Sequence, residues 1–398
     1  MEHKHKSLAT ASSQAEGACA DYAVDRLSNV PREVAHHILS LVNFRDLTRV
    51  GSVSKRCREF YLSTPSLKFS SSGNRQQQLN LLNCIDRYMI RRGDDKIKSF
   101  CINWDFSASI SEEGFRMMTW IHIAVRCNVE VLDLELRLNE KDGATLELPC
   151  CIYSCQSMRS LSVKTCTILK APSFACSNNL QHLKLKNVRM DEGCGKWISC
   201  SCTCIKDIWL EDVRVDSFTV ESSSLESFTL LYTYNRDPCH FSISGEKLAK
   251  MNIQWEISQA SNRITRSLNV YAPNLKYLKW IGDLLNYQNF GKFMCLEKAH
   301  IFLKHQGDDY DFDNAFEVLC SLYRVKSLVL SEDTTKLLLR EGSMHAPLDA
   351  TTYLGLHIMS LTDDLVPAMA SLLRGMPNLK TLYINSYPSL HIVKPESK

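Results

Sequence analysis

Long hydrophobic runs are missing from this sequence of 398 residues. A membrane-spanning helix needs about 18 or more consecutive apolar residues, and no stretch of the chain reaches that length. The first 20 residues, MEHKHKSLATASSQAEGACA, start with basic side chains but lack the apolar segment of a secretion signal. Neither a membrane span nor secretion is therefore indicated, and we expect a protein of the cytosol, the nucleus or both.

A strong net charge is missing as well. The chain has 47 lysines and arginines against 44 aspartates and glutamates, which gives a formal net charge of +3. These charges are spread along the sequence, so they do not predict binding to nucleic acid or to an anionic membrane. With 44% hydrophobic and 23% charged residues, the composition is that of an ordinary globular protein, and its length predicts roughly two or three domains.

Motifs for catalysis or cofactor binding are also absent. The sequence contains neither a glycine-rich phosphate-binding loop nor a nucleophile elbow. His36 and His37 lie in an expected helix, and no motif places a nucleophile or a carboxylate beside them. We expect solvated or packing histidines, no catalytic residues and no cofactor, and therefore a protein that is not an enzyme.

Cysteine is abundant, with 17 residues. Without a secretion signal, this number predicts free thiols in a reducing compartment rather than a disulfide framework. Cys194, Cys200, Cys202 and Cys204 could suggest a zinc site, but they lack the paired spacing that such sites favour. The acidic stretch from Asp308 to Asp313 lacks the glycine and terminal glutamate of a calcium loop. We expect no bound metal.

The stretch from Asp25 to Phe69 carries the clearest helix signals. Pro31 suits the first turn of a helix, where a missing amide hydrogen costs nothing, and Glu33 suits the positive end of the helix dipole. Leu27 precedes this helix, and Leu39 lies off its apolar stripe, which leaves apolar surface without an internal partner. The stripe itself consists of Val34, Ile38, Leu41 and Val42.

Two further short helices are expected in the same stretch. Asp46 can cap one that carries Leu47, Val50 and Val53, and Ser54 can cap another. Three short helices in about 45 residues form a unit too small for a comfortably stable core. We therefore expect a partner that covers the remaining apolar surface.

These residues resemble the F-box of plant F-box/leucine-rich-repeat proteins. The resemblance implies docking to the Skp-family adaptor of a cullin-RING ubiquitin ligase. In this chain Asn43 replaces a common proline and Cys57 replaces a common tryptophan, and the loss of a large anchor predicts weaker docking. The matching positions are Asp25-Arg26-Leu27-Ser28, Pro31, Glu33, His36 to Leu41, Arg45-Asp46, Ser54-Lys55-Arg56, Leu62-Ser63, Pro65, Leu67 and Phe69. The resemblance assigns adaptor contact to Leu27, Pro31, Val34, Ile38, Leu39, Leu41 and Val50.

An internal repeat begins at Ile97. An apolar residue, two variable residues, an apolar residue, one variable residue and a third apolar residue recur in about twelve units. The spacing of the middle anchors is in the leucine-rich-repeat range of roughly 20–29 residues, and two anchors two residues apart suit one face of a short strand. Leu161, Leu183, Ile208, Phe228, Met251, Leu278 and Ala299 are middle anchors, and their numbers differ by 22, 25, 20, 23, 27 and 21.

Three units carry two more apolar positions after their anchors. Met158, Leu180 and Ile205 are followed eight residues later by Cys166, Val188 and Val213, and ten residues later by Ile168, Met190 and Val215. The asparagine usual in such repeats is absent from these units, which predicts an uneven arc. Phrases at Ile152 to Met158, Gly195 to Val213 and Ala272 to Trp280 resemble the repeat region of the same plant family, and Gly375 to Ile384 resembles its FBD-like C-terminal domain in truncated form.

The sequence thus predicts an α/β protein in four parts. The fold is an N-terminal three-helix F-box followed by a leucine-rich-repeat solenoid with a parallel β-sheet on its concave face. The parts are a disordered leader at 1–20, the F-box at 21–69, a helical linker at 70–96 and the repeat domain at 97–398.

The variable residues beside the last two anchors of each unit are expected on the concave face. Lysines with interspersed aromatics there could hold an acidic, partly apolar peptide, although they could equally be the solvated face of a sheet. The substrate-binding candidates are Lys164, Lys184, Lys186, Trp209, Lys250, Tyr277, Lys279 and His300, with His182, Gln254, Lys298 and Phe302 beside them.

The expected function is a substrate-recognition subunit of a ubiquitin ligase. The helical module would bind the Skp-family adaptor, and the repeats would hold an unknown target protein. One alternative is an interaction scaffold or decoy without ubiquitin transfer, which the missing tryptophan at Cys57 motivates. The other is a small-molecule co-receptor, which ranks last because the solenoid shows no evident basic floor.

Overall fold

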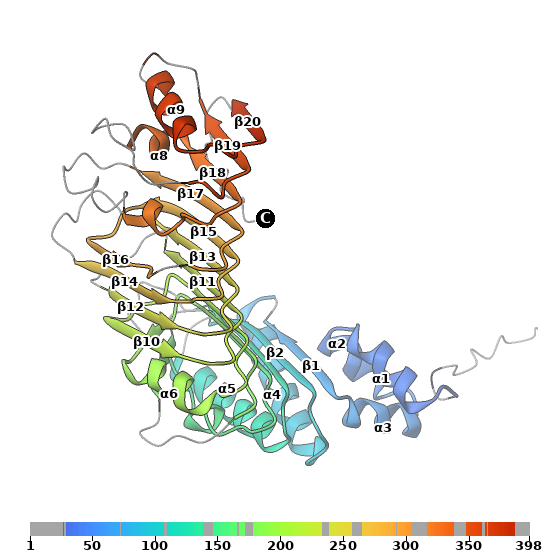
Figure 1. Ribbon diagram of the computed structural model, residues 1–398. Coiled ribbons are helices and arrows are strands. Elements are labelled where there is room, and N and C mark those ends of the chain that lie inside the picture. The colour runs from blue at the N-terminus through green and yellow to red at the C-terminus, as the bar shows by residue number, and fades with distance from the viewer. Residues whose placement is uncertain are drawn as a thin grey trace, which may run out of the picture.

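Three short helices precede a long curved sheet of parallel strands (Figure 1). The computed structural model describes residues 27, 29–71, 73–106, 110–137, 146–164, 167–171, 178–232, 239–256, 265–291, 293–304, 317–337, 348–359, 363 and 365–386. Within these residues no helix combines the length and the apolar composition needed to cross a membrane. The leader 1–20 and the stretch from Asp308 to Asp313 lie outside the described residues.

The predicted three-helix unit is confirmed as α1 (Arg32–Ser40), α2 (Phe44–Val50) and α3 (Lys55–Ser63). Ser54 caps α3 as predicted, because its side chain accepts a hydrogen bond from the amide of Cys57 at 3.1 Å. The predicted cap of α2 was wrong. Asn43 caps this helix by accepting from the amide of Asp46 at 2.9 Å, and the Asp46 carboxylate accepts from the Asn43 amide group at 2.8 Å. A proline at this position would lack that side-chain acceptor.

The buried face of α1 is the opposite of the one that the apolar stripe suggested. Ala35 and Leu39 are 0% and 1% exposed, whereas Val34, Ile38 and Leu41 are 45%, 41% and 76% exposed. The helix packs on α3 and on the first strand of the sheet. The small Ala35 side chain permits this close approach. The rotation of α1 about its axis is therefore set by how closely each face can pack, and not by how many apolar residues each face carries.

Within the described segments the main sheet contains thirteen strands, all parallel to their neighbours, which confirms the predicted solenoid. Twelve of them, β2 to β20 in the order below, carry the twelve units found in the sequence. The thirteen strands are β1 (Ser66–Ser70), β2 (Ser99–Asp105), β3 (Val131–Arg137), β5 (Ser160–Lys164), β7 (His182–Lys186), β9 (Asp207–Glu211), β11 (Ser227–Tyr232), β13 (Lys250–Trp255), β15 (Tyr277–Asp283), β17 (Lys298–Lys304), β18 (Ser327–Ser331), β19 (Tyr353–Ile358) and β20 (Thr381–Ser386).

The register places equivalent anchors side by side. Leu183 pairs with Ile208, and Ile208 pairs with Phe228 on the next strand. Each strand of this kind buries alternate residues, so the anchors form a continuous apolar ladder under the sheet. Even the weak anchor Ala299 is 0% exposed. The exception is the last strand, where Leu382 and Ile384 are 42% and 41% exposed.

Behind the main sheet, the layer changes along the arc from helices to strands and back to helices (Figure 1). Among the extra apolar positions of the sequence, Ile168 and Met190 lie in outer strands, whereas Cys166 lies outside the described residues. Val188, Val213 and Val215 flank Arg189 and Arg214, which form a parallel bridge. Val188, Met190, Val213 and Val215 are all at most 5% exposed. The outer helices are α4 (Arg75–Arg92), α5 (Ile110–Arg126), α6 (Gly193–Ser201), α8 (Glu332–Leu337) and α9 (Leu365–Arg374), with a short turn η2 (Cys150–Ile152). The outer strands are β4 (Leu146–Glu147), β6 (Thr167–Leu169), β8 (Arg189–Met190), β10 (Ser217–Glu221), β12 (Cys239–Ser244), β14 (Arg266–Tyr271) and β16 (Tyr287–Asn289).

The predicted boundary between F-box and repeats differs from the structure. Ser66–Ser70, which was assigned to the F-box, is the first strand of the main sheet and pairs with β2 from Ser66–Ser99 to Ser70–Asn103. The segment predicted as a linker holds α4, which packs against α3 and α5 as part of the outer layer. The repeat sheet therefore starts about thirty residues before position 97.

The helices of the F-box and the first repeats share one core. The Phe69 ring lies 4.9 Å from Phe44 of α2, 5.5 Å from Phe100 of β2 and 5.8 Å from Trp120 of α5, measured between ring centroids. All four side chains are at most 5% exposed. Burial of such aromatic contacts links the two parts into one packed unit rather than two domains on a flexible tether.

Candidate functional site

The first candidate surface lies on α1. Pro31, Val34, Ile38 and Leu41 are exposed on the side of the helix turned away from the core, and we call them the α1 surface. Val34 and Ile38 are four residues apart and so lie one above the other on the helix. Two large aliphatic side chains on a 9-residue helix and a third at its C-cap, all left partly in solvent, form the kind of patch that a partner covers.

The other predicted adaptor contacts are placed differently. Leu27 and Val50 are half-buried and pack against the core. Leu39 is 1% exposed, so its predicted contact with an adaptor is wrong: the side chain holds α1 against the core. Cys57 is 0% exposed, which means that its departure from the family pattern changes packing beneath α3 rather than the exposed surface.

A cavity of about 430 Å³ opens beside these helices. Within the described part of the chain, the guanidinium groups of Arg32, Arg56 and Arg91 have no carboxylate at ion-pairing distance there. The lining residues are Arg32, Arg56, Glu59, Phe60, Leu62, Ser63, Arg91, Arg92 and Asp95.

His36 has the environment of a packing residue and contacts two residues of the cavity lining. Its Nε2 lies 3.0 Å from the Ser63 hydroxyl oxygen, and its ring meets the edge of Phe60 at 6.3 Å. Burial, followed by the nearby charges of Arg32 and Arg92, lowers the pKa of His36. The neighbouring His37 is exposed.

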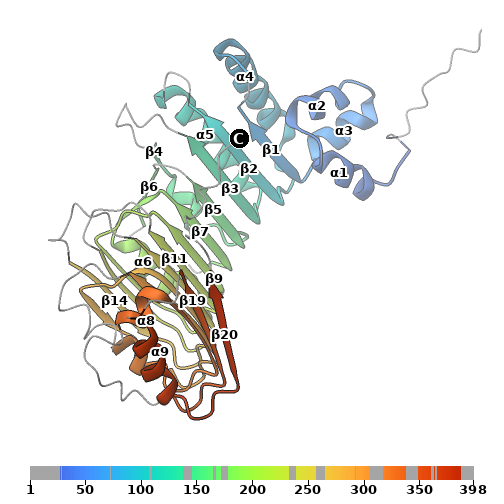
Figure 2. The same ribbon diagram turned by 90° about the horizontal axis from the view of Figure 1, so that it is seen from above.

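The second candidate surface is the concave face of the main sheet (Figure 2). Outward positions alternate with buried anchors along each strand, and the parallel register aligns them in rows. All of the predicted substrate-binding residues occupy such outward positions. They are Lys164 on β5, Lys184 and Lys186 on β7, Trp209 on β9, Lys250 on β13, Tyr277 and Lys279 on β15, and His300 on β17.

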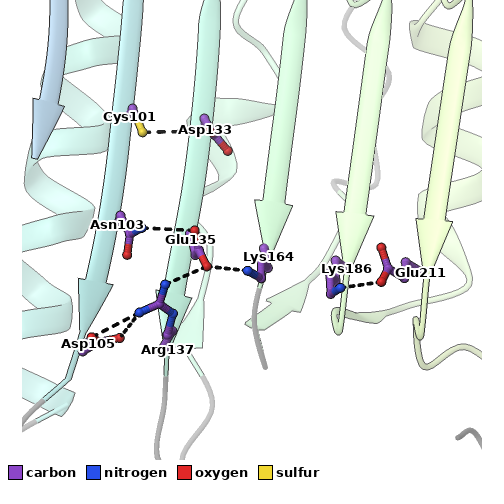
Figure 3. A network of polar contacts seen from close by, with 9 residues as sticks. All are labelled: Cys101, Asn103, Asp105, Asp133, Glu135, Arg137, Lys164, Lys186 and Glu211. Carbon is purple, nitrogen blue, oxygen red and sulfur yellow. Dashed lines mark hydrogen bonds and ion pairs between the residues drawn. The ribbon is translucent and has the colours of Figure 1, made fainter. Parts of the chain in front are cut away.

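The lysines of the first strands are not free to hold an acidic ligand as predicted. Lys164 forms an ion pair with Glu135 of β3, and Lys186 forms one with Glu211 of β9 (Figure 3). Hydrogen bonding from Lys164 lowers the pKa of the Glu135 carboxyl. Lys184 lies over the ring of Trp209, with its ammonium 5.0 Å from the centroid.

The same network continues toward the first strand (Figure 3). Arg137 donates hydrogen bonds to Glu135 at 3.0 Å and to Asp105 of β2 at 3.1 Å. Asn103 donates to the other oxygen of Glu135 at 3.1 Å. The N-terminal part of the concave face is therefore a self-neutralised polar surface, a property that depends on cross-strand pairs and that the sequence analysis missed.

The C-terminal part of the face is aromatic and basic. The ring of Tyr277 lies 5.6 Å from His300, and that of Phe302 lies 5.3 Å from His357 of β19. The ammonium of Lys250 lies 5.9 Å from the Tyr277 centroid. The sequence analysis missed His357, although its position directly after the anchor Leu356 matched that of Phe302 after Ile301.

The cysteines of α6 and its C-terminal turn do not converge. Cys194 and Cys202 are buried, whereas Cys200 and Cys204 are exposed. The Cys194 thiol donates a hydrogen bond to the carbonyl oxygen of Leu169 at 3.3 Å. In the part of the chain that the structure describes, no group of three or more histidine, cysteine or acidic side chains is arranged to hold a metal ion.

Comparison with known families and proteins agrees with this architecture. The family model for the F-box domain matches residues 27–60, and the model described as the At1g61320/AtMIF1 LRR domain matches residues 91–212. The chain is 25% identical over 211 residues to the F-box/LRR-repeat protein At3g26922 of Arabidopsis thaliana. The matched region covers 52% of this chain and 67% of that protein.

Two longer matches come from the same plant. The putative F-box/LRR-repeat protein At3g58920 is 22% identical over 395 residues, 91% of this chain and 78% of the relative. The putative F-box/FBD/LRR-repeat protein At4g00315 is 22% identical over 391 residues, 94% of this chain and 81% of the relative. Similarity thus extends over the helical module and the repeats together.

Proposed function

The chain is an F-box/leucine-rich-repeat protein of the plant type, and on this basis we propose that it is the substrate-recognition subunit of a Skp–cullin–F-box ubiquitin ligase. The α1 surface binds the Skp-family adaptor, and the concave face binds the target protein. The protein performs no covalent chemistry itself. It acts in the cytosol or the nucleus, because free thiols such as those of this chain persist in a reducing compartment.

The observation that carries this proposal is the exposed aliphatic surface on a helix that is otherwise firmly packed. Val34 and Ile38 remain 45% and 41% exposed, although Ala35 and Leu39 on the same helix are at most 1% exposed. A helical unit of this size gains stability when a partner covers such residues. Exposed apolar anchors of this kind are also typical of a specific interface.

In this proposal, the rigid fold relates the adaptor bound at the F-box helices to the target bound on the concave face. Because α1–α3 and the first repeats share one core, the concave face has a fixed position relative to the adaptor. A target held there is presented at a high effective concentration to the charged ligase. A flexible connection would reduce this advantage, since effective concentration falls as the link lengthens.

The test is adaptor binding by the double variant Val34→Ala/Ile38→Ala. Removal of two interface anchors should weaken the affinity for a purified Skp-family adaptor by about tenfold or more. The matched control is Ile90→Ala on α4, because Ile90 is 78% exposed but lies outside the F-box helices. Titration by biolayer interferometry gives the affinities, and urea unfolding shows that the variants remain folded. Equal affinity for the double variant and the wild-type protein would refute the docking assignment.

The scaffold or decoy alternative loses the observation that motivated it. It rested on the missing tryptophan at Cys57, and the side chain of Cys57 lies in the core. Reconstituted ligase that binds the chain and a captured target, yet never transfers ubiquitin to that target, would favour this alternative over the proposed function.

A further inference from the structure

We propose that the C-terminal half of the concave face, formed by β13, β15, β17, β18, β19 and β20, is the docking surface for a short acidic peptide that carries aromatic or aliphatic side chains. This inference rests on the proposed function, because the peptide would belong to the target protein. It adds the place on the arc and the chemistry of the segment. The N-terminal half of the same face would contribute little to recognition.

The N-terminal and C-terminal halves of the concave face differ in the charges that they carry. On β1 to β11, the outward positions hold five acidic residues and five lysines or arginines, so the formal charges cancel. Most of them pair with one another, as Lys164 does with Glu135. The acidic residues are Asp105, Asp133, Glu135, Asp207 and Glu211, and the basic residues are Lys68, Arg137, Lys164, Lys184 and Lys186.

On the C-terminal half, the first three outward rows contain Lys250, Lys279 and Lys298 and, on the described strands, no carboxylate. None of these lysines has a carboxylate of the described residues at ion-pairing distance. Beside these rows, the exposed Glu297 precedes β17, Asp283 at the end of β15 is 5% exposed, and Glu256 after β13 pairs with Lys304 at 3.4 Å. Three unpaired ammonium groups thus face the same concave surface.

Aromatic rings form the floor between these lysines. Tyr277, His300, Phe302 and His357 follow one another with centroid distances of 5.6, 6.5 and 5.3 Å. Their side chains are half-buried, so each ring presents apolar surface to solvent. The strip crosses from β15 to β19, and such rigid aromatic surface is a frequent anchor for a bound peptide.

Small residues on β18 and β19 make the strip continuous. Val329 lies between His300 and Gly355 in the register and is 7% exposed. A side chain at Gly355 would come within 3.3 Å of Val329 and within 3.4 Å of the Tyr353 ring. The glycine therefore allows the Tyr353 ring to lie close to Val329 and to extend the apolar floor.

The size of this surface defines the ligand. Four strand spacings separate β13 from β19, which is about 19 Å at 4.7–4.9 Å for each spacing. An extended peptide covers that distance with about six residues. Alternate side chains of an extended segment point to the same side, so acidic residues could reach the lysines while apolar residues contact the rings.

The environment of His300 agrees with an anionic ligand. Burial lowers the pKa of His300, and the charges of Lys279, Lys298 and His357 lower it further. A carboxylate bound between these groups would offset their mutual repulsion. The positive charges of the lysines and the histidine repel one another, and a bound acidic peptide would reduce this repulsion.

The experiment is selection from a random seven-residue peptide display library on the full chain bound to its adaptor. We expect selected peptides to be rich in aspartate or glutamate together with phenylalanine, tyrosine or leucine. A synthetic, labelled copy of a selected peptide should bind Lys279→Gln/Lys298→Gln about tenfold or more weakly than wild type. Its affinity should also fall with added salt.

The matched control is Lys164→Gln/Lys186→Gln, which removes the same charge from the N-terminal half of the face and should change peptide affinity by about twofold or less. Adaptor affinity and unfolding midpoints are measured for both variants. Selection of basic or uncharged peptides, a failure to select any peptide, or an equal loss in the two variants overturns the inference. Because adaptor binding is recorded separately, such a result would leave the docking of the F-box standing.

Discussion

The Nη1 atom of Arg92 donates a hydrogen bond of 2.5 Å to the carbonyl oxygen of Thr64. The same side chain donates to the carbonyl oxygens of Leu62 at 3.0 Å and Lys96 at 3.0 Å, and it is 4% exposed. Thr64 follows α3, whereas Lys96 precedes the second strand of the sheet. One buried guanidinium thus connects the end of the F-box helices with the entry to the repeats.

Replacing Arg92 by methionine should lower the free energy of unfolding by about 3 kcal/mol, because several buried carbonyl oxygens lose a charged donor. Urea unfolding followed by circular dichroism measures the change. Arg91→Met is the control, since Arg91 is exposed and its replacement should stay within about 0.5 kcal/mol. Equal stability of the two variants would show that the Arg92 hydrogen bonds do not hold the junction.

Substitution of two neighbouring residues of α1 should affect different properties, one the stability of the chain and the other its adaptor affinity. Leu39→Ala should cost about 2–5 kcal/mol of stability, because it leaves a cavity in the core at a side chain that is 1% exposed. Ile38→Ala should change stability by less than about 1 kcal/mol but weaken adaptor binding. Unfolding curves and adaptor titrations of both variants separate the two roles. A stable Leu39→Ala protein that fails to bind would instead place Leu39 in the interface.

Asn43 should contribute as a helix cap. Asn43→Ala removes the acceptor for the Asp46 amide and should destabilise the chain by about 1 kcal/mol. Asn43→Ser keeps an acceptor at the cap and should recover most of that loss. The two unfolding midpoints decide the matter: if the serine variant is no more stable than the alanine variant, capping is not the reason for the effect.

The cysteines near α6 should react at very different rates with iodoacetamide. Burial raises the pKa of the Cys202 thiol to about 12, and burial with the neighbouring Asp191 also raises the pKa of Cys194. Because the thiolate is the reactive form, these two should be protected until the chain unfolds. Cys200 and Cys204 are exposed and should be modified in the native protein. Mass spectrometry of labelled peptides gives the rates, and protection of Cys200 and Cys204 that a chelator removes would indicate a metal site.

Stability should decrease as the pH falls below about 6.5. Burial lowers the pKa values of His36 and His300 from 6.5, so between the lowered value and 6.5 the unfolded chain binds more protons than the folded chain. Their contribution is complete above 6.5 and is lost as the pH falls through the lowered pKa values. The carboxyls of Glu130 and Glu135, whose pKa values are lowered from 4.5, act at more acidic pH.

The check is the urea midpoint from neutral pH down to about pH 5.5. His36→Asn/His300→Asn should flatten the dependence, whereas His37→Asn, at an exposed position, should leave it unchanged. A wild-type midpoint that rises toward acidic pH would contradict the prediction.

How well the sequence predicted the structure differs from element to element. The twelve-fold apolar phrase identified every strand of the main sheet from β2 to β20, because a buried strand repeats its anchors at a spacing of two residues. It missed β1, since Leu67 and Phe69 were assigned to the F-box motif in which they also occur. The sequence analysis singled out the extra positions Val188, Met190, Val213 and Val215 but did not predict the outer layer.

The candidate sites were harder to predict. The sequence located the apolar residues of α1 but reversed the buried and exposed sides, because Ala35 looks weakly apolar and yet allows the closest helix packing. It also located the outward lysines of the sheet. Their pairing with Glu135 and Glu211 joins residues that are 29 and 25 positions apart in sequence, and no local pattern records it.

The sequence by itself determined the period, the parallel strands and the three helices, because these follow from residue spacing along the chain. The tertiary structure decided which side of α1 stays exposed, where the sheet begins and which lysines on the concave face remain unpaired. These depend on distances between segments far apart in sequence. Such distances exist only once the repeats are stacked and the F-box helices are packed onto the first of them.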